Sequence, residues 1–144
     1  MNVNQTLDAL VKAYGNGDSA PTRAQWEGVL GRDPDKPFAL INFFKFREVA
    51  EYDDTTPAIS GQEAFQRYAA VSMPAMQAAG GSFLLVGPHH GSLIGPDPEW
   101  DMVAIGRYPN VQAFCALYED TGYQAAFAHR TAAVERQSVQ VVAI

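Results

Sequence analysis

The sequence predicts an α+β fold in which one antiparallel sheet is built in the order β-α-β-β-α-β, the split βαβ arrangement. Two observations predict it. Strand-like segments at 38–46, 82–87, 100–108 and 138–144 alternate with helical patterns, in that order along the chain. The length of 144 residues also suits one buried core rather than several. The core domain is expected to span residues 37–144, and a helical arm, residues 1–36, precedes it.

The arm is predicted from apolar residues at helical spacing, which in its first segment are Val3, Leu7, Leu10, Val11 and Tyr14. Gly15 is the expected end of this helix, and residues 16–21 form a loop rich in turn formers. A second helix is expected to begin at Thr22, because Gln25 completes a capping box, and to end at Gly31.

The segment FALINFFKF (38–46) is apolar at both odd and even positions, which is typical of a central strand buried on both faces. Asn42 and Lys45 interrupt it, and because they are three residues apart they lie on opposite faces. A polar group in such a strand is costly unless it finds a partner. The polar residues 47–59 are expected to form a loop at the sheet edge.

The remaining elements follow from caps and breaks. Ser60 and Glu63 form a capping box for a helix that Pro74 should kink and that ends at Gly80–Gly81. Strands 82–87 and 100–108 form a hairpin with a long loop. A further helical stretch follows Pro109, breaks at 119–122 and is expected to reach Val134 before the strand at 138–144.

Helices cover only one face of such a sheet, whereas the first strand is apolar on both. The second face therefore needs a cover. We expect a homodimer in which the sheets of two copies face each other around a twofold axis. The alternative is that the arm of residues 1–36 folds against this second face and covers it.

Composition excludes several partners. The net charge of −6 and the scattered Lys and Arg residues argue against binding to nucleic acid or to an anionic membrane surface. No apolar run is long enough to span a bilayer, and the first residues do not resemble a signal peptide. One cysteine, Cys115, cannot form an internal disulfide and lies on an apolar helix face. A cytoplasmic protein with a buried, inert thiol is expected.

Several segments together resemble the bacterial family called domain of unknown function 1330. They are FALINFFKF, SGQEAFQRYA, the Gly80–Gly81 pair, WDMVAIGRYP and the Tyr123-to-Arg130 helix, and they cover about residues 36–144. The resemblance implies a ferredoxin-like dimeric α/β barrel with a pocket in each protomer between sheet and helices. It implies no reaction, because the family has none assigned. Proteins that share the barrel include cofactor-independent monooxygenases, lactone isomerases and haem proteins, an analogy of fold alone.

Asp101 and Asn42 are the candidate catalytic residues. Asp101 sits in an otherwise apolar strand, where burial would raise its pKa and suit it to general acid–base work. The alternative is a structural carboxylate paired with a nearby Lys or Arg. Asn42 would orient a substrate carbonyl, or would bond to the end of a neighbouring helix.

Candidate substrate-binding residues lie on several elements. Arg130 shares an inward helical stripe with Tyr123, and we expect it to pair with Asp101, Glu119 or Asp120, or else to capture an anionic ligand. Aromatic residues would wall the pocket, Lys45 would form ion pairs at the sheet rim, and His89 would reach over the pocket mouth. The full set is Arg130, Tyr123, Trp100, Tyr68, Tyr108, Lys45 and His89.

His89 and His90 lie between Pro88 and Gly91, where the sequence predicts a hairpin loop rather than a metal site. Adjacent side chains diverge, and no second ligand accompanies them at a metal-binding spacing. No cofactor-binding motif is present, so no cofactor is expected.

These observations leave three hypotheses for function. The first is a cofactor-independent enzyme, an isomerase or monooxygenase that abstracts a proton from a small hydrophobic or aromatic substrate. The second is a non-catalytic module that binds a small acid through Arg130. The third is a purely structural homodimer.

Overall fold

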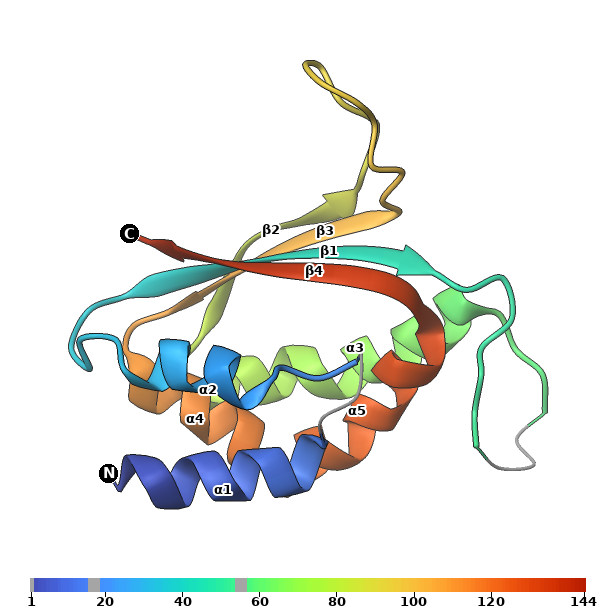
Figure 1. The fold of residues 1–144 in the computed structure, drawn as a ribbon. Helices are drawn as coiled ribbons and strands as arrows, with labels where there is room; N and C mark the ends of the chain where they lie inside the picture. Colours follow the sequence, from blue (N-terminus) through green and yellow to red (C-terminus); the bar gives the residue numbers. More distant parts are fainter. Residues whose placement is uncertain (1, 16–18, 54–56) are drawn as a thin grey trace.

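A computed structural model describes residues 2–15, 19–53 and 57–144 of the chain, and parts of two predicted loops, residues 16–18 and 54–56, lie outside this description. The predicted α+β fold with a ferredoxin-like core is confirmed (Figure 1). The strands form one antiparallel sheet in the order β2-β3-β1-β4. The elements in chain order are α1 (Val3–Tyr14), α2 (Arg23–Leu30), β1 (Phe38–Phe46), α3 (Gly61–Ala78), β2 (Ser82–Pro88), β3 (Met102–Tyr108), α4 (Val111–Glu119), α5 (Thr121–Ala133) and β4 (Val134–Ala143).

The helices begin where side chains cap them. Thr22 and Gln25 form the predicted capping box at the start of α2. The Ser60 hydroxyl accepts the N–H of Glu63 at the start of α3, at 3.0 Å, which satisfies one free donor of the first turn. α3 then continues through Pro74 to Ala78.

All the helices lie on one side of the sheet, and α1 lies farthest from it (Figure 1). Phe38, Leu40 and Phe44 point from β1 into the helical layer and are 0–5% exposed. The alternate residues line the opposite side of the sheet, which we call the open face. Its apolar residues, read from the strand register, are Ala39, Ile41, Phe43, Leu85, Val103, Ile105 and Val142.

The arm packs against the helical layer and does not cover the open face, so the alternative cover that the sequence left open is wrong (Figure 1). Trp26 of α2 is 1% exposed and contacts the rings of Tyr14, Phe114 and Tyr118. The hydroxyl of Tyr14 donates to the backbone oxygen of Tyr118 at 2.7 Å. The buried residues of arm and core form one hydrophobic cluster.

Two strands begin at residues other than those predicted from the sequence. β4 begins at Val134, directly after α5, and not at 138. It is an edge strand paired only with β1, so its polar residues Glu135 and Arg136 stay exposed without cost, and their polarity conceals the strand. β3 begins at Met102, which leaves Trp100 and Asp101 in the connection before it.

Candidate ligand-binding cavity

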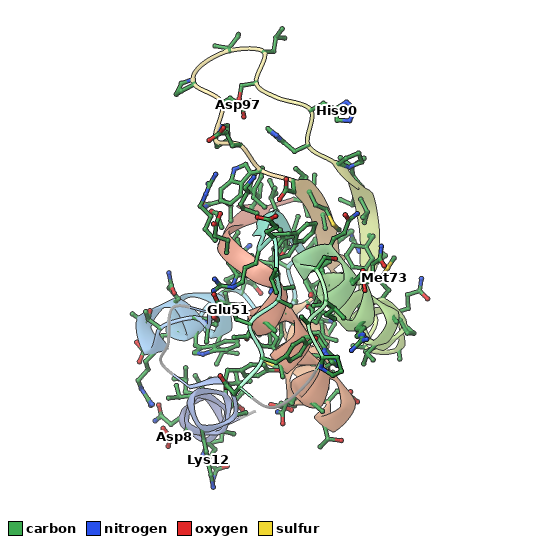
Figure 2. All side chains as sticks on the ribbon, turned by 90° about the vertical axis from the view of Figure 1, so that its right-hand side faces the viewer. Asp8, Lys12, Glu51, Met73, His90 and Asp97 are labelled. Carbon is green, nitrogen blue, oxygen red and sulfur yellow. The ribbon has the colours of Figure 1, made fainter. Side chains whose placement is uncertain are left out.

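A cavity of about 60 Å³ lies between the sheet and the helices. Its floor is the helix-facing side of β1 and β3, and its walls come from α3, α4 and α5. Met73 and Val86 also line it and are each 42% exposed, so they mark its mouth. Figure 2 shows Met73 at the outer edge of α3. The space suffices for several water molecules or for one small organic molecule.

Arg130 of α5 lies against this cavity with only 5% of its surface exposed. Its Nε and Nη2 donate to Oε1 of Gln137 at 3.0 and 2.8 Å, and Nη1 donates to the hydroxyl of Tyr68 at 3.2 Å. Its guanidinium carbon stands 4.9 Å from the centre of the Phe44 ring. The side chain that pairs with Arg130 is thus the neutral amide of Gln137, and the predicted pairing with Asp101, Glu119 or Asp120 is wrong.

The guanidinium stays charged. Burial by itself lowers the pKa of Arg130, but the oxygens of Tyr68, Tyr123 and Tyr118 outweigh burial, so the pKa is raised overall. Within the described residues, no carboxylate forms an ion pair with this charge. A guanidinium has five N–H donors, and three are used by Gln137 and Tyr68. The Tyr118 hydroxyl is a further hydrogen-bond partner of Arg130. At least one N–H donor therefore remains for another partner.

Tyrosine hydroxyls surround the guanidinium. The oxygens of Tyr68 and Tyr123 are 2.6 Å apart, and both residues line the cavity. Burial, followed by the neighbouring tyrosines, raises the pKa of Tyr123, so this hydroxyl stays protonated at neutral pH. Burial likewise raises the pKa of Tyr108, which is 4% exposed and lines the same cavity. The cavity therefore holds one full positive charge among neutral hydroxyls.

Asn42 lies on the cavity floor, on the helix-facing side of β1. Its Nδ2 donates to the backbone oxygens of Ala104 at 3.0 Å and of Leu40 at 3.3 Å. Both amide hydrogens are thereby used, so Asn42 has no free donor with which to orient a substrate carbonyl, the role expected from the sequence.

Asp101 lies elsewhere. Its Oδ2 accepts the backbone N–H of Phe46 at 2.8 Å, and its own backbone N–H donates to the backbone oxygen of Phe44 at 2.7 Å. Nζ of Lys45 lies 3.7 Å from Oδ1 of Asp101. These bonds fasten the start of β3 to the end of β1. The Asp101 side chain lines a separate surface depression, together with Arg47 and others, and is not among the residues of the Arg130 cavity.

Three other candidates also lie outside the cavity lining. Lys45 lies on the open face, on the opposite side of β1 from Asn42. Trp100 packs against Phe43 of the open face, with ring centres 5.7 Å apart. The backbone N–H of His89 donates to the backbone oxygen of Asp101 at 3.1 Å, at the base of the predicted hairpin loop. Tyr68, Tyr108, Tyr123, Asn42 and Arg130 are the candidates that the fold brings together.

The loop between β2 and β3 projects away from the sheet on the side of the open face (Figure 1). His90 and Asp97 lie on this loop (Figure 2). Its tip exposes Leu93 and Ile94, which are 98% and 92% accessible. In the part of the chain that the structure describes, no group of three His, Cys, Asp or Glu residues is placed to hold a metal ion.

Sequence reasoning missed Gln137, the partner of Arg130, and made no use of Ser72. Ser72 lines the cavity from α3 and is 7% exposed. A hydroxyl on an otherwise apolar helical stripe was the one available signal for it. Cys115 is 4% exposed, and burial together with Glu119 raises the pKa of its thiol to about 11, which keeps it un-ionised at neutral pH.

The fold and the cavity define a class: an α+β protein that encloses a positively charged pocket between one antiparallel sheet and its helical layer. The family follows from sequence. Residues 55–144 match the family described as Domain of unknown function (DUF1330), and the chain belongs to this family. None of the curated proteins searched matches the chain. No helix in the described part of the chain has the length and apolar character needed to cross a membrane.

The solved structures that are similar to the chain include two crystal structures. The crystal structure of methylated RPA0582 protein is 32% identical, with a TM-score of 0.81 over 90% of this chain and 96% of that one. A crystal structure of the RPA0582 protein of unknown function from Rhodopseudomonas palustris is 32% identical, with a TM-score of 0.80 over 89% of this chain and 97% of that one. Residues 37–144 make up three quarters of the 144-residue chain, so both matches extend into the arm.

Proposed function

We propose that this protein is a homodimer that binds a small organic acid at Arg130, inside the cavity of each protomer. One observation supports the ligand class: a buried, charged guanidinium with at least one unused donor and no carboxylate partner in the described residues. Burying a charge without a counter-charge is costly. A ligand carboxylate would supply that counter-charge and accept a hydrogen bond from the guanidinium.

Binding is favoured over the catalytic hypothesis because of where Asp101 lies. A general base has to stand within hydrogen-bond reach of the substrate proton. The Asp101 carboxylate accepts the N–H of Phe46, faces Lys45 and lines a different depression. Proton abstraction by Asp101 stays a prediction from the sequence, as does the cytoplasmic location.

Arg130→Gln is expected to abolish acid binding. In the wild-type protein, a small carboxylate at a hundredfold excess over its dissociation constant adds about 2.7 kcal/mol to the free energy of unfolding. That stabilisation corresponds to a rise in Tm of roughly 5–10 °C for a chain of this size. The measurement is a thermal-shift series with acetate, propionate, butyrate, lactate and benzoate on both proteins.

Two control variants sharpen this test. Arg107→Gln removes a positive charge from the open face of β3 and should leave the Tm shift unchanged. Gln137→Glu places a carboxylate beside Arg130, so it should preserve the fold and lower acid affinity at least about tenfold. An equal Tm shift in wild type and Arg130→Gln, or no shift in wild type with any acid, contradicts the proposal.

The open face supports the homodimer. The described helices all lie on the other side of the sheet, so this face meets solvent in a single protomer (Figure 1). Ile41, Ile105 and Leu85 form a row across three strands, and Leu85 is 57% exposed. An apolar sheet face of this kind is stable when another layer covers it. A second copy covers it with the same residues.

Ile105→Lys is expected to convert the dimer to a monomer. Ile105 lies on an inner strand of the open face, opposite Ile41, so a lysine there would be buried without a partner at the interface. Light scattering at about 10 µM should give twice the chain mass for wild type and the single mass for the variant. Gln112→Lys, on the exposed side of α4, adds the same charge and should remain a dimer. A monomeric wild type contradicts the dimer.

A further inference from the structure

The amide of Asn42 has a fixed orientation. Its Nδ2 lies 3.0 Å and 3.3 Å from two backbone oxygens, those of Ala104 and Leu40. The flipped amide would set Oδ1 against both of these acceptors, so the hydrogen-bond network settles which atom is nitrogen. Both backbone oxygens belong to the sheet, and Oδ1 is therefore turned away from the sheet. No described residue donates to Oδ1.

Asn42 and Arg130 thus give the cavity two polar groups of opposite hydrogen-bonding character. Gln137, which holds the guanidinium, pairs with Phe44, and Asn42 lies two residues farther along β1 on the same side. Diagonal neighbours of this kind on adjacent strands are roughly 7–8 Å apart. One group donates hydrogen bonds from a cation, and the other accepts a hydrogen bond from a neutral group. Leu40 and Phe44 flank Asn42 on the same side of β1, so the cavity floor around Asn42 is apolar.

We propose that the cavity is selective for small hydroxy acids, whose carboxylate pairs with Arg130 and whose hydroxyl donates to Oδ1 of Asn42. This inference rests on the proposed acid-binding function and names its ligand class. An acid without a donor would leave Oδ1 unpaired in a cavity from which it has displaced water, which is costly. A keto acid would set one oxygen acceptor against another. An amino acid would bring its ammonium close to the positive charge of Arg130.

The size of the cavity restricts the class further. A volume of about 60 Å³ admits a short chain, and the apolar residues beside Asn42 favour a ligand that also carries a methyl or methylene group. Lactate and 3-hydroxybutyrate meet these requirements. Propionate and butyrate match them in shape but lack the hydroxyl, and pyruvate and acetoacetate carry a carbonyl in its place.

Isothermal titration of the full chain with these six acids, and with alanine, tests the inference. We expect at least one hydroxy acid to bind about tenfold or more tightly than its deoxy and keto counterparts, and alanine to bind more weakly still. Asn42→Leu keeps the size of the side chain and removes the acceptor. The variant should bind hydroxy and deoxy acids within about threefold of each other, because Arg130 still holds the carboxylate.

The outcomes separate this inference from the function on which it rests. If wild type binds deoxy or keto acids as tightly as hydroxy acids, selection by Asn42 is overturned and acid binding at Arg130 stands. If no acid binds, both are overturned. If Asn42→Leu retains the full preference for hydroxy acids, Asn42 is not the selecting group. If that variant does not fold, the comparison of the acids on wild type still decides.

Discussion

Replacing Gly61 with alanine is expected to destabilise the fold by about 3 kcal/mol or more. Gly61 begins α3 at a point where the ends of β1 and α5 also meet. Its N–H donates to the backbone oxygen of Arg47, and the N–H of Arg47 donates to the backbone oxygen of Ala133. A Cβ on Gly61 would overlap the backbone oxygen of Arg47 and would lie 2.8 Å from the backbone oxygen of Ala133. Backbone cannot move aside as a flexible side chain does, so the cost lies at the upper end for overpacking.

Urea unfolding measures this loss, and a second glycine supplies the control. Gly28 lies inside α2 with nothing within 4 Å of an added Cβ, so Gly28→Ala should stabilise the protein by about 0.5–1 kcal/mol through helix propensity. The same substitution should therefore lower the free energy of unfolding at Gly61 and raise it at Gly28. A loss below about 1 kcal/mol at Gly61 would show that the point where α3, β1 and α5 meet relaxes easily.

Trp26→Ala is expected to cost about 3–5 kcal/mol, the range for removing a large buried aromatic side chain. Trp26 is 1% exposed and packs edge-on against Tyr118, which lines the cavity. The substitution should therefore lower the free energy of unfolding and also weaken acid binding, because the wall of the cavity loses its support. Urea unfolding and the thermal-shift series measure the two effects.

Two further variants qualify that result. Trp26 Nε1 has no hydrogen-bond partner among the described residues, so Trp26→Phe removes an unpaired donor and should cost clearly less than Trp26→Ala. Trp100→Ala removes the other tryptophan, which is only partly buried, and should cost less than Trp26→Ala. Equal losses at the two tryptophans would mean that the arm does not support the helical layer.

The fold could be predicted because its main signals are local. The apolar residues at both parities of 38–46 indicated a central strand, and the capping pair Thr22 and Gln25 located α2. The start of β4 could not be predicted, since an edge strand exposes Glu135 and Arg136 and its polar letters match a loop equally well. The packing of the arm depends on tertiary contacts of Trp26 that no local pattern encodes.

The candidate site could be predicted only in part. Helical spacing put Tyr123 and Arg130 on one buried face, and strand alternation put Asn42 opposite Lys45. The partner of Arg130 could not be predicted, because Gln137 lies on β4, and the sequence predicted that this strand begins only at residue 138. Asp101 looked like a strand residue inside a pocket, yet it precedes β3 and bonds to β1.

The two tryptophans occupy different surroundings: Trp26 lies in the helical layer, whereas Trp100 stacks beneath the Arg136 guanidinium, 4.3 Å from its carbon, beside the open face. The chain thus carries its two tryptophan fluorophores in separate environments. Emission from Trp26 reports on how firmly the arm is seated, and emission from Trp100 reports on what covers the sheet. Variants that keep one tryptophan each would allow the two regions to be followed separately by intrinsic fluorescence, without an added label.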